Sequence, residues 1–171
     1  MPRRSQTETA VLGALSVEPM TGYAVRAAIT STLGHFWNES FGQIYPALER
    51  LAANGLVVRD AEKRFVLTDA GLDRLRELLS EPFEEAPARN GLLLRLFFGR
   101  MLGREVCVEL LEEARSSSQR TLETMAGIRA VVEAESDSPD QLYFLVTIAA
   151  GEASARAQVQ WATESIALLS R

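Results

Sequence analysis

The chain of 171 residues contains only one cysteine and one histidine. A single cysteine, Cys107, cannot form an internal disulfide, so the composition favours a reducing, cytoplasmic location. With His35 as the only histidine, a zinc site of cysteine and histidine ligands cannot be assembled. The longest apolar stretches, around 92–98 and 142–150, fall well short of the ~20 residues that cross a bilayer. We therefore expect a soluble protein without a metal and without a membrane segment.

Motifs of catalysis are lacking as well. The sequence contains no glycine-rich phosphate loop, no recognisable pair of catalytic carboxylates and no nucleophile beside a general base. The acidic pairs Glu84-Glu85 and Glu112-Glu113 are most simply explained as solvated charges. We expect a protein that is not an enzyme and uses no cofactor.

The net charge of −5 argues at first against a nucleic-acid-binding surface. Residues 1–80, however, carry nine basic and nine acidic groups, whereas residues 81–171 carry nine arginines and fourteen acidic groups. The whole excess of negative charge therefore lies in residues 81–171. The neutral first half remains able to contact DNA through a few arginines and helix N-termini.

Proline and glutamate mark a boundary between two domains. The segment 80–91 holds two prolines and three glutamates, which disfavour a continuing helix. We expect a first domain over residues 1–80, a linker over 81–90 and a second domain over 91–171.

The first domain has the element order of a winged helix-turn-helix. Apolar periodicity and capping residues predict four helices, over residues 7–16, 21–34, 40–54 and 69–79. Two short apolar runs, 56–58 and 65–67, flank the charged segment 59–64 and predict a β-hairpin. In the second domain the sequence predicts only helices, over residues 92–103, 104–134 and 139–169. We expect a mainly α (α+β) fold, a winged helix-turn-helix followed by an all-helical C-terminal domain.

A motif in the third predicted helix resembles a known family. Residues 42–51 read GQIYPALERL and residues 55–57 read GLV. With Leu12-Gly-Ala-Leu15 and Met20-Thr-Gly-Tyr23 upstream and Leu67-Thr-Asp-Ala-Gly71 downstream, this pattern resembles the PadR family of transcriptional regulators. The resemblance covers nearly the whole chain and is most specific over residues 40–71. It implies a homodimeric regulator, of repressor type, that binds double-stranded DNA at a pseudo-palindromic operator.

Gln43 is the best candidate for a contact to a base. Its carboxamide can pair bidentately with adenine. Ser40 and Gln43 also form a capping-box pattern, in which the same carboxamide would bond to the backbone instead. One set of side-chain atoms cannot do both, and the sequence leaves the two roles open.

Further DNA contacts are implied at the start of the second helix and along the third. The resemblance implies that Tyr45 contacts the DNA backbone. The alternative is that Tyr45 is a half-buried aromatic side chain with a packing role only. The resemblance implies a DNA contact for Tyr23 as well. The backbone amides of Thr21, Gly22 and Tyr23, at the N-terminus of the predicted helix, could bind a phosphate. The family often has histidine at the position of Thr21.

The hairpin is the place where the chain departs from the family, whose wing is commonly longer and rich in arginine and lysine. Arg59, Lys63 and Arg64 could reach phosphates, but Asp60 and Glu62 oppose them. A hairpin that is merely solvated is the alternative. We expect weak non-specific binding with a small salt dependence.

The C-terminal helices are predicted to dimerise, because two long helices expose more apolar surface than one short helix covers. The residues predicted for this interface are Leu93, Leu96, Phe97, Leu142, Leu145, Ile148 and Trp161. In the family, aromatic residues near the dimer centre can stack on planar effectors, so Trp161 is also the candidate for binding a small aromatic effector. The alternative function is a winged-helix adaptor that binds proteins without specific DNA binding.

Overall fold

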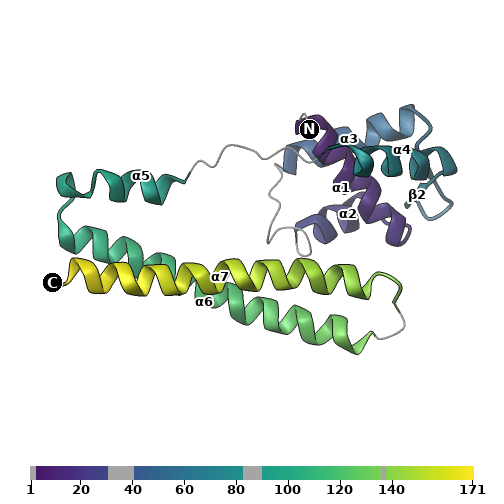
Figure 1. The fold of residues 1–171 in the computed structure, drawn as a ribbon. Helices are drawn as coiled ribbons and strands as arrows, with labels where there is room; N and C mark the ends of the chain where they lie inside the picture. Colours follow the sequence, from purple (N-terminus) through teal and green to yellow (C-terminus); the bar gives the residue numbers. More distant parts are fainter. Residues whose placement is uncertain (1–2, 31–40, 83–89, 136–137) are drawn as a thin grey trace. The chain divides into compact units, whose positions relative to one another are not determined.

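The computed structural model describes residues 3–30, 41–82, 90–135 and 138–171. The chain divides into two compact units, Met1–Ala86 and Pro87–Arg171, of which the first contains a two-stranded antiparallel sheet (Figure 1). The N-terminal unit is built from α1 (Arg3–Val17), α2 (Gly22–Ala28), α3 (Phe41–Ala53), β1 (Val57–Arg59), β2 (Phe65–Leu67) and α4 (Asp69–Ser80). The predicted mainly helical fold with a winged helix-turn-helix is confirmed. None of the described helices is apolar over a length that would cross a membrane.

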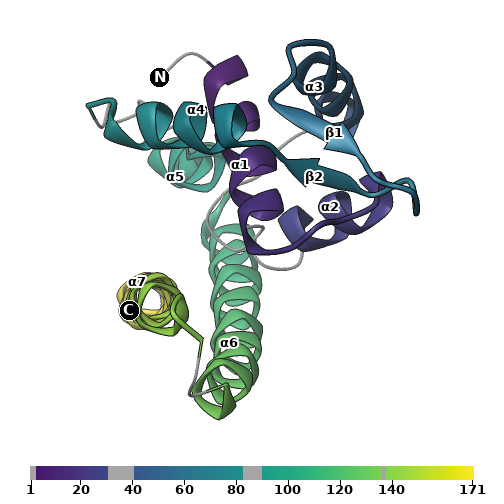
Figure 2. The ribbon, with the colours of Figure 1, turned by 90° about the vertical axis from the view of Figure 1, so that its right-hand side faces the viewer.

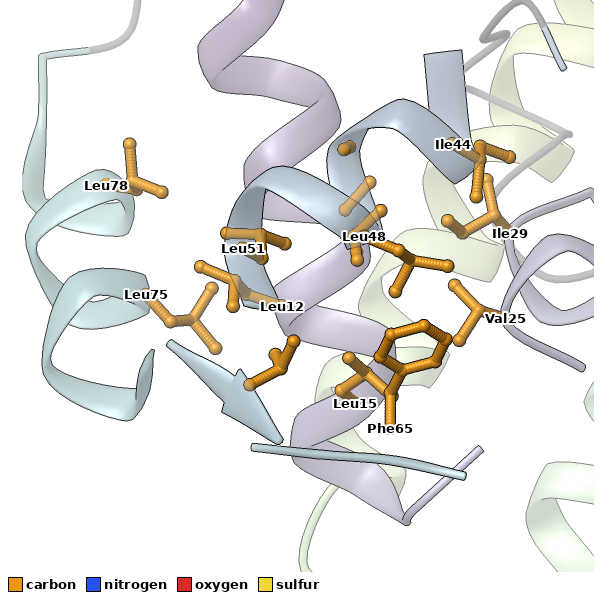
Figure 3. Close-up of a cluster of buried hydrophobic side chains, with 14 residues drawn as sticks. Leu12, Leu15, Val25, Ile29, Ile44, Leu48, Leu51, Phe65, Leu75 and Leu78 are labelled. Atoms are coloured by element: carbon orange, nitrogen blue, oxygen red, sulfur yellow. The ribbon is translucent and has the colours of Figure 1, made fainter. Parts of the chain in front are cut away.

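One apolar cluster holds the N-terminal unit together. Its side chains converge from α1, α2, α3, β2 and α4 (Figure 3). In α1 the side chains of Val11, Leu12 and Leu15 are all buried. Leu79, near the end of α4, is 67% exposed. In α4 the buried leucines are Leu75 and Leu78, so residue 79 falls outside the buried stripe.

The hairpin is tied to the helices at several points. β1 and β2 pair antiparallel, with Val58 opposite Val66, and Figure 2 shows them as a ribbon beside α3. Met20, just ahead of α2, forms a further bridge to β2, because its amide and carbonyl both hydrogen-bond to the backbone of Phe65, at 3.1 and 2.7 Å. Backbone hydrogen bonds therefore join the segment just ahead of α2 to the hairpin.

The turn from α3 into β1 requires a glycine. Gly55 has φ +70°, a left-handed conformation that side chains other than glycine and asparagine rarely adopt. The amide of Leu56 donates to the carbonyl of Leu51 and the amide of Gly55 to that of Ala52, which satisfies carbonyls at the helix end. The predicted end of this helix at Asn54-Gly55 is confirmed.

Two predicted N-caps are present, and each bonds to an amide three residues ahead in the chain. The Thr21 hydroxyl accepts a hydrogen bond from the amide of Ala24, and the Thr68 hydroxyl accepts one from the amide of Gly71. The Thr68 hydroxyl also donates to backbone carbonyls at Gly55 and Leu56. Thr68 thereby joins the start of α4 to the turn that precedes β1.

The C-terminal unit contains α5 (Gly91–Phe97), the 3₁₀ helix η2 (Gly99–Met101), α6 (Arg104–Ala134) and α7 (Gln141–Leu169). The boundaries of α6 match the prediction. The single helix predicted over 92–103 was wrong, because the chain breaks at Phe98 into α5 and η2. The last helix begins after Pro139, not at it. The Gln141 side chain donates to the carbonyl of Val132 and holds the turn between α6 and α7.

Helices α6 and α7 pack antiparallel along their length (Figure 1). A small residue allows the close approach of the two helices, because a Cβ at Gly151 would lie 3.2 Å from the Met125 sulfur. An ion pair also crosses this contact, because the buried Glu152 carboxylate accepts hydrogen bonds from Arg129 at 2.9 and 3.2 Å and from Arg156 at 3.0 Å. The bonds from Arg129, opposed by desolvation and reinforced by Arg156, lower the pKa of Glu152.

Replacing Gly71 with alanine should strongly destabilise the N-terminal unit. An added Cβ would collide with the Leu56 carbonyl oxygen and lie 2.8 Å from the Leu67 side chain. We expect a loss of about 3 kcal/mol in the free energy of unfolding, measured by urea denaturation. Gly13→Ala is the matched control, since a Cβ at this position in α1 would meet no described atom within 4 Å apart from its chain neighbours and the backbone of its own helix. That variant should gain about 0.5–1 kcal/mol, and equal losses in both would contradict the packing at Gly71.

Glu152→Gln should lower the melting temperature most at neutral pH. The lowered pKa of Glu152 means that its charged form stabilises the folded state above the ordinary value of 4.5 and stops doing so as the pH falls through the folded-state value. The gap between wild type and variant should therefore shrink between pH 7 and pH 3. Glu133→Gln, which removes a longer contact of 3.5 Å to Arg129, should show a smaller gap throughout. A gap independent of pH would contradict the assignment.

Candidate nucleic-acid interface

Helix α3 has one buried face and one exposed face. Ile44, Ala47, Leu48 and Leu51 are buried in the apolar cluster, at the i, i+3, i+4, i+7 spacing of an amphipathic helix. The opposite face exposes the side chains of Gln43, Tyr45, Pro46, Glu49 and Arg50. Burial of the first set therefore fixes the direction in which the second set points.

Gln43 lies in the first turn of this exposed face. Its side chain is exposed and makes no hydrogen bond to any of the described residues. Ser40, the other half of the capping pattern, lies outside the described residues, as does His35. Base contact by Gln43 remains a prediction. The exposed position of its side chain is compatible with that role.

Tyr45 and the start of α2 lie against each other. A Cβ at Gly22 would come within 2.9 Å of Cε1 of Tyr45, so the ring covers the backbone at this glycine. Tyr45 is nevertheless 46% exposed and Tyr23 is 73% exposed. The hydroxyl of Thr21 is engaged in capping α2. The structure thus brings Thr21, Gly22 and Tyr45 together on one side of the N-terminal unit.

The first arginine of the wing is already paired. Nη2 of Arg59 lies 2.8 Å from a carboxylate oxygen of Glu49 on α3, and its guanidinium lies 4.5 Å from the centroid of the Phe65 ring. Phe65 is directly opposite Arg59 in the hairpin register. Arg59 therefore connects the wing to α3 and is not an isolated cation for a phosphate.

The wing tip is closed by a second set of contacts. Arg64 bonds to Asp60 at 2.8 Å and to Glu62 at 3.2 Å, and its backbone amide also donates to the Asp60 carboxylate. Desolvation raises the pKa of Asp60, but the hydrogen bonds from Arg64 outweigh it and lower the pKa overall. Lys63 sits at the turn with φ +62° and an exposed side chain.

These contacts decide what the surface can do chemically. Both arginines of the wing have acidic partners within the protein, so only part of their charge is available to a phosphate. The exposed polar and aromatic side chains of α3 and α2 offer hydrogen bonds and stacking surface instead. The sequence singled out Arg59 but missed Glu49 and Phe65 as its partners. The cross-strand position of Phe65 could have been inferred from the hairpin register, whereas the contact from α3 could not.

The residues predicted for the dimer interface all lie in the C-terminal unit. Leu93, Phe97 and Leu142 are exposed, while Leu96, Leu145 and Trp161 are half-buried. Ile148 is buried within the protomer, with only 6% of its surface exposed, and so offers no surface to a partner. Its apolar character is explained by packing inside the helix pair.

Comparison with known proteins finds two families along the chain. Residues 11–77 match the transcriptional regulator PadR-like family, and residues 88–170 match the virulence activator alpha C-terminal family. The negative transcriptional regulator PadR of Bacillus subtilis is 25% identical to this chain, in an alignment that covers 95% of this chain and 96% of that protein.

Solved structures resemble nearly the whole chain. A PadR-like transcriptional regulator from Bacillus cereus has a TM-score of 0.84 at 21% identity, covering 96% of this chain and 98% of that one. The Vibrio cholerae virulence activator AphA has a TM-score of 0.78 at 25% identity, covering 96% and 98%. Bacillus subtilis PadR in complex with operator DNA has a TM-score of 0.77 at 23% identity, covering 95% and 98%.

Glu49→Gln should strengthen binding to any DNA duplex. The substitution removes the carboxylate that pairs with Arg59 and frees one cation at the edge of α3. Fluorescence anisotropy at several salt concentrations should show tighter binding and a slope of log K against log salt steeper by about one unit. Asp73→Asn, which changes the net charge equally on α4, is the control and should leave the slope unchanged. Weaker binding by the Glu49 variant would instead indicate that the pair positions the wing.

Proposed function

The chain belongs to the PadR-like family of transcriptional regulators, and we propose that it represses transcription by binding a pseudo-palindromic operator as a homodimer. Each protomer places α3 in the major groove, with one half-site per winged helix. The half-sites are separated by about one helical turn or a multiple of it. The observation that carries this proposal is the exposed face of α3, which presents Gln43 and Tyr45 while the opposite face is locked into the core.

Direct contacts are assigned by chemistry. Gln43 reads a base through its carboxamide, and the exposed residues Tyr23 and Tyr45 contact the DNA backbone through their hydroxyl groups. Thr21 and Gly22 place the start of α2 beside Tyr45. Lys63 contributes a phosphate contact, whereas Arg59 and Arg64 contribute little beyond their internal ion pairs. Ser40, which lies outside the described residues, is the remaining contact predicted from the sequence.

The dimer is supported by where apolar side chains remain exposed. Among the described residues, twelve of the seventeen large hydrophobic side chains that are exposed lie in the C-terminal unit. Phe97, Met101 and Leu142 are among the most exposed, at 83%, 84% and 72%. A surface of this kind is unusual for a monomer and is typical of an interface between copies.

The repressor assignment and the effector follow the relatives. The Bacillus subtilis relative is a negative regulator, and a structure of that protein in complex with p-coumaric acid is similar to this chain, with a TM-score of 0.78 at 23% identity. We infer that this regulator works in the cytoplasm, catalyses no reaction and is released from its operator by a small aromatic effector. The exposed recognition face favours this function over that of a protein-binding adaptor.

Gln43→Ala tests the proposed function at the level of a single contact. Anisotropy with the DNA upstream of the protein's own gene should show a loss of about 1–3 kcal/mol for the specific duplex and little change for a random duplex. Arg64→Ala is the comparison and should change both duplexes alike and slightly. Equal affinity of the wild type for upstream and random DNA would support the adaptor instead, and equal effects of both variants would remove the base-reading role of Gln43.

A further inference from the structure

Most of the basic side chains in the N-terminal unit already have partners within the protein. The structure describes seven of them, and four form ion pairs with nitrogen–oxygen distances from 2.8 to 3.2 Å, namely Arg59, Arg64, Arg74 and Arg76. Arg26 on α2 has an interaction as well. Among these seven, only Arg50 and Lys63 form no ion pair and no side-chain hydrogen bond with any described residue. The sequence predicts a phosphate contact for Lys63, but it does not single out Arg50.

Arg50 lies on the exposed face of α3, seven residues after Gln43. Seven residues make almost two complete turns of an α-helix, so the two side chains leave the helix on the same side and about 10 Å apart along its axis. Both side chains are exposed. The burial of Leu48 and Leu51 fixes the rotation of the helix between them. A partner that contacts Gln43 along the helix therefore also meets Arg50.

The neighbouring Glu49 does not neutralise Arg50. Adjacent residues of a helix do not face each other. The Glu49 carboxylate instead lies 2.8 Å from Nη2 of Arg59, in the wing that Figure 2 shows beside α3. The exposed face of α3 thus carries a negative charge that the wing holds and a positive charge that no described residue holds.

We propose that Arg50 binds a phosphate at the edge of the major groove in which Gln43 reads a base. The proposal rests on the proposed function, because that function lays the DNA along α3. The major groove is about 12 Å wide, so a side chain about 10 Å further along the helix than a base-reading residue reaches the wall of the groove, where the phosphates lie. A guanidinium forms paired, charge-assisted hydrogen bonds to phosphate oxygens. Such a contact fixes the position of the protein on the duplex and is independent of sequence.

Two other roles for Arg50 make different predictions. Arg50 belongs to the last turn of α3, where a cation stabilises the helix through its dipole without any DNA. That role would change the melting temperature and leave DNA binding unaltered. A bidentate contact to guanine is the other role, and it would weaken binding to a specific duplex only.

The test is fluorescence anisotropy of the full-length protein with two labelled duplexes. One carries the DNA upstream of the protein's own gene, and the other is a shuffled duplex of the same length and composition. With Arg50→Gln we expect both duplexes to bind about fivefold more weakly for each bound protomer at about 0.1 M salt. Between about 50 and about 200 mM salt, the slope of log K against log salt should become shallower by about one for each protomer.

Arg76→Gln is the matched control. It removes the same charge from α4, but Arg76 is paired with Asp73 at 2.8 Å, so both affinity and slope should stay close to those of the wild type. Arg50→Lys keeps a cation at the position and should retain the wild-type slope. An equal loss in Arg50→Gln and Arg76→Gln would indicate a general effect of net charge and would overturn the proposal.

The remaining outcomes separate this contact from the proposed function. A lower melting temperature of Arg50→Gln with unchanged DNA binding would restrict Arg50 to the helix dipole, and a loss confined to the upstream duplex would make it a base contact. Either result overturns the phosphate assignment while the operator function stands. If the wild type shows no preference for the upstream duplex but Arg50→Gln weakens both, the phosphate contact stands and the operator function fails.

Discussion

The burial of one face of α3 is the constraint on which the rest of the N-terminal unit depends. Ile44, Leu48 and Leu51 enter a cluster shared with α1, α2, β2 and α4, and in doing so they determine the rotation of the helix about its axis. Every exposed side chain of α3 takes its direction from that rotation. Core packing thus sets the orientation of the face that we propose to read DNA, and substitutions deep in the cluster should change the position of the exposed side chains.

Ion pairs in the wing reduce the positive charge that the N-terminal unit presents to a partner. The sequence contains three basic residues there, but Arg59 is held by Glu49 and Arg64 by Asp60 and Glu62. Surface pairs of this kind contribute only about 0–1 kcal/mol to stability, so their main effect is on the charge presented to a partner. Both arginines of the wing are therefore in contact with carboxylates, and only part of their charge is available to a partner.

Features set by neighbours in the chain could be predicted, and features set across space could not. The caps at Thr21 and Thr68 involve partners three residues away, and the left-handed Gly55 follows from the end of a helix. The need for glycine at position 71 arises from the carbonyl of Leu56, fifteen residues earlier, and nothing in the local pattern reveals it. Ile148 was predicted for the dimer interface but is buried in its own protomer, because apolar character alone does not say which surface a side chain faces. Among the candidate contacts, the exposure of Gln43, Tyr45 and Tyr23 agrees with their predicted roles, while the pairing of Arg59 needed the folded chain.

The hydrogen bonds between Met20 and Phe65 have a mechanical consequence. They add a strand-like segment to the hairpin and clamp it immediately ahead of α2, so that the wing cannot swing without dragging that helix with it. The two hydrogen bonds therefore oppose any motion of the wing that is independent of the start of α2. A displacement of either element is therefore expected to be transmitted to the other.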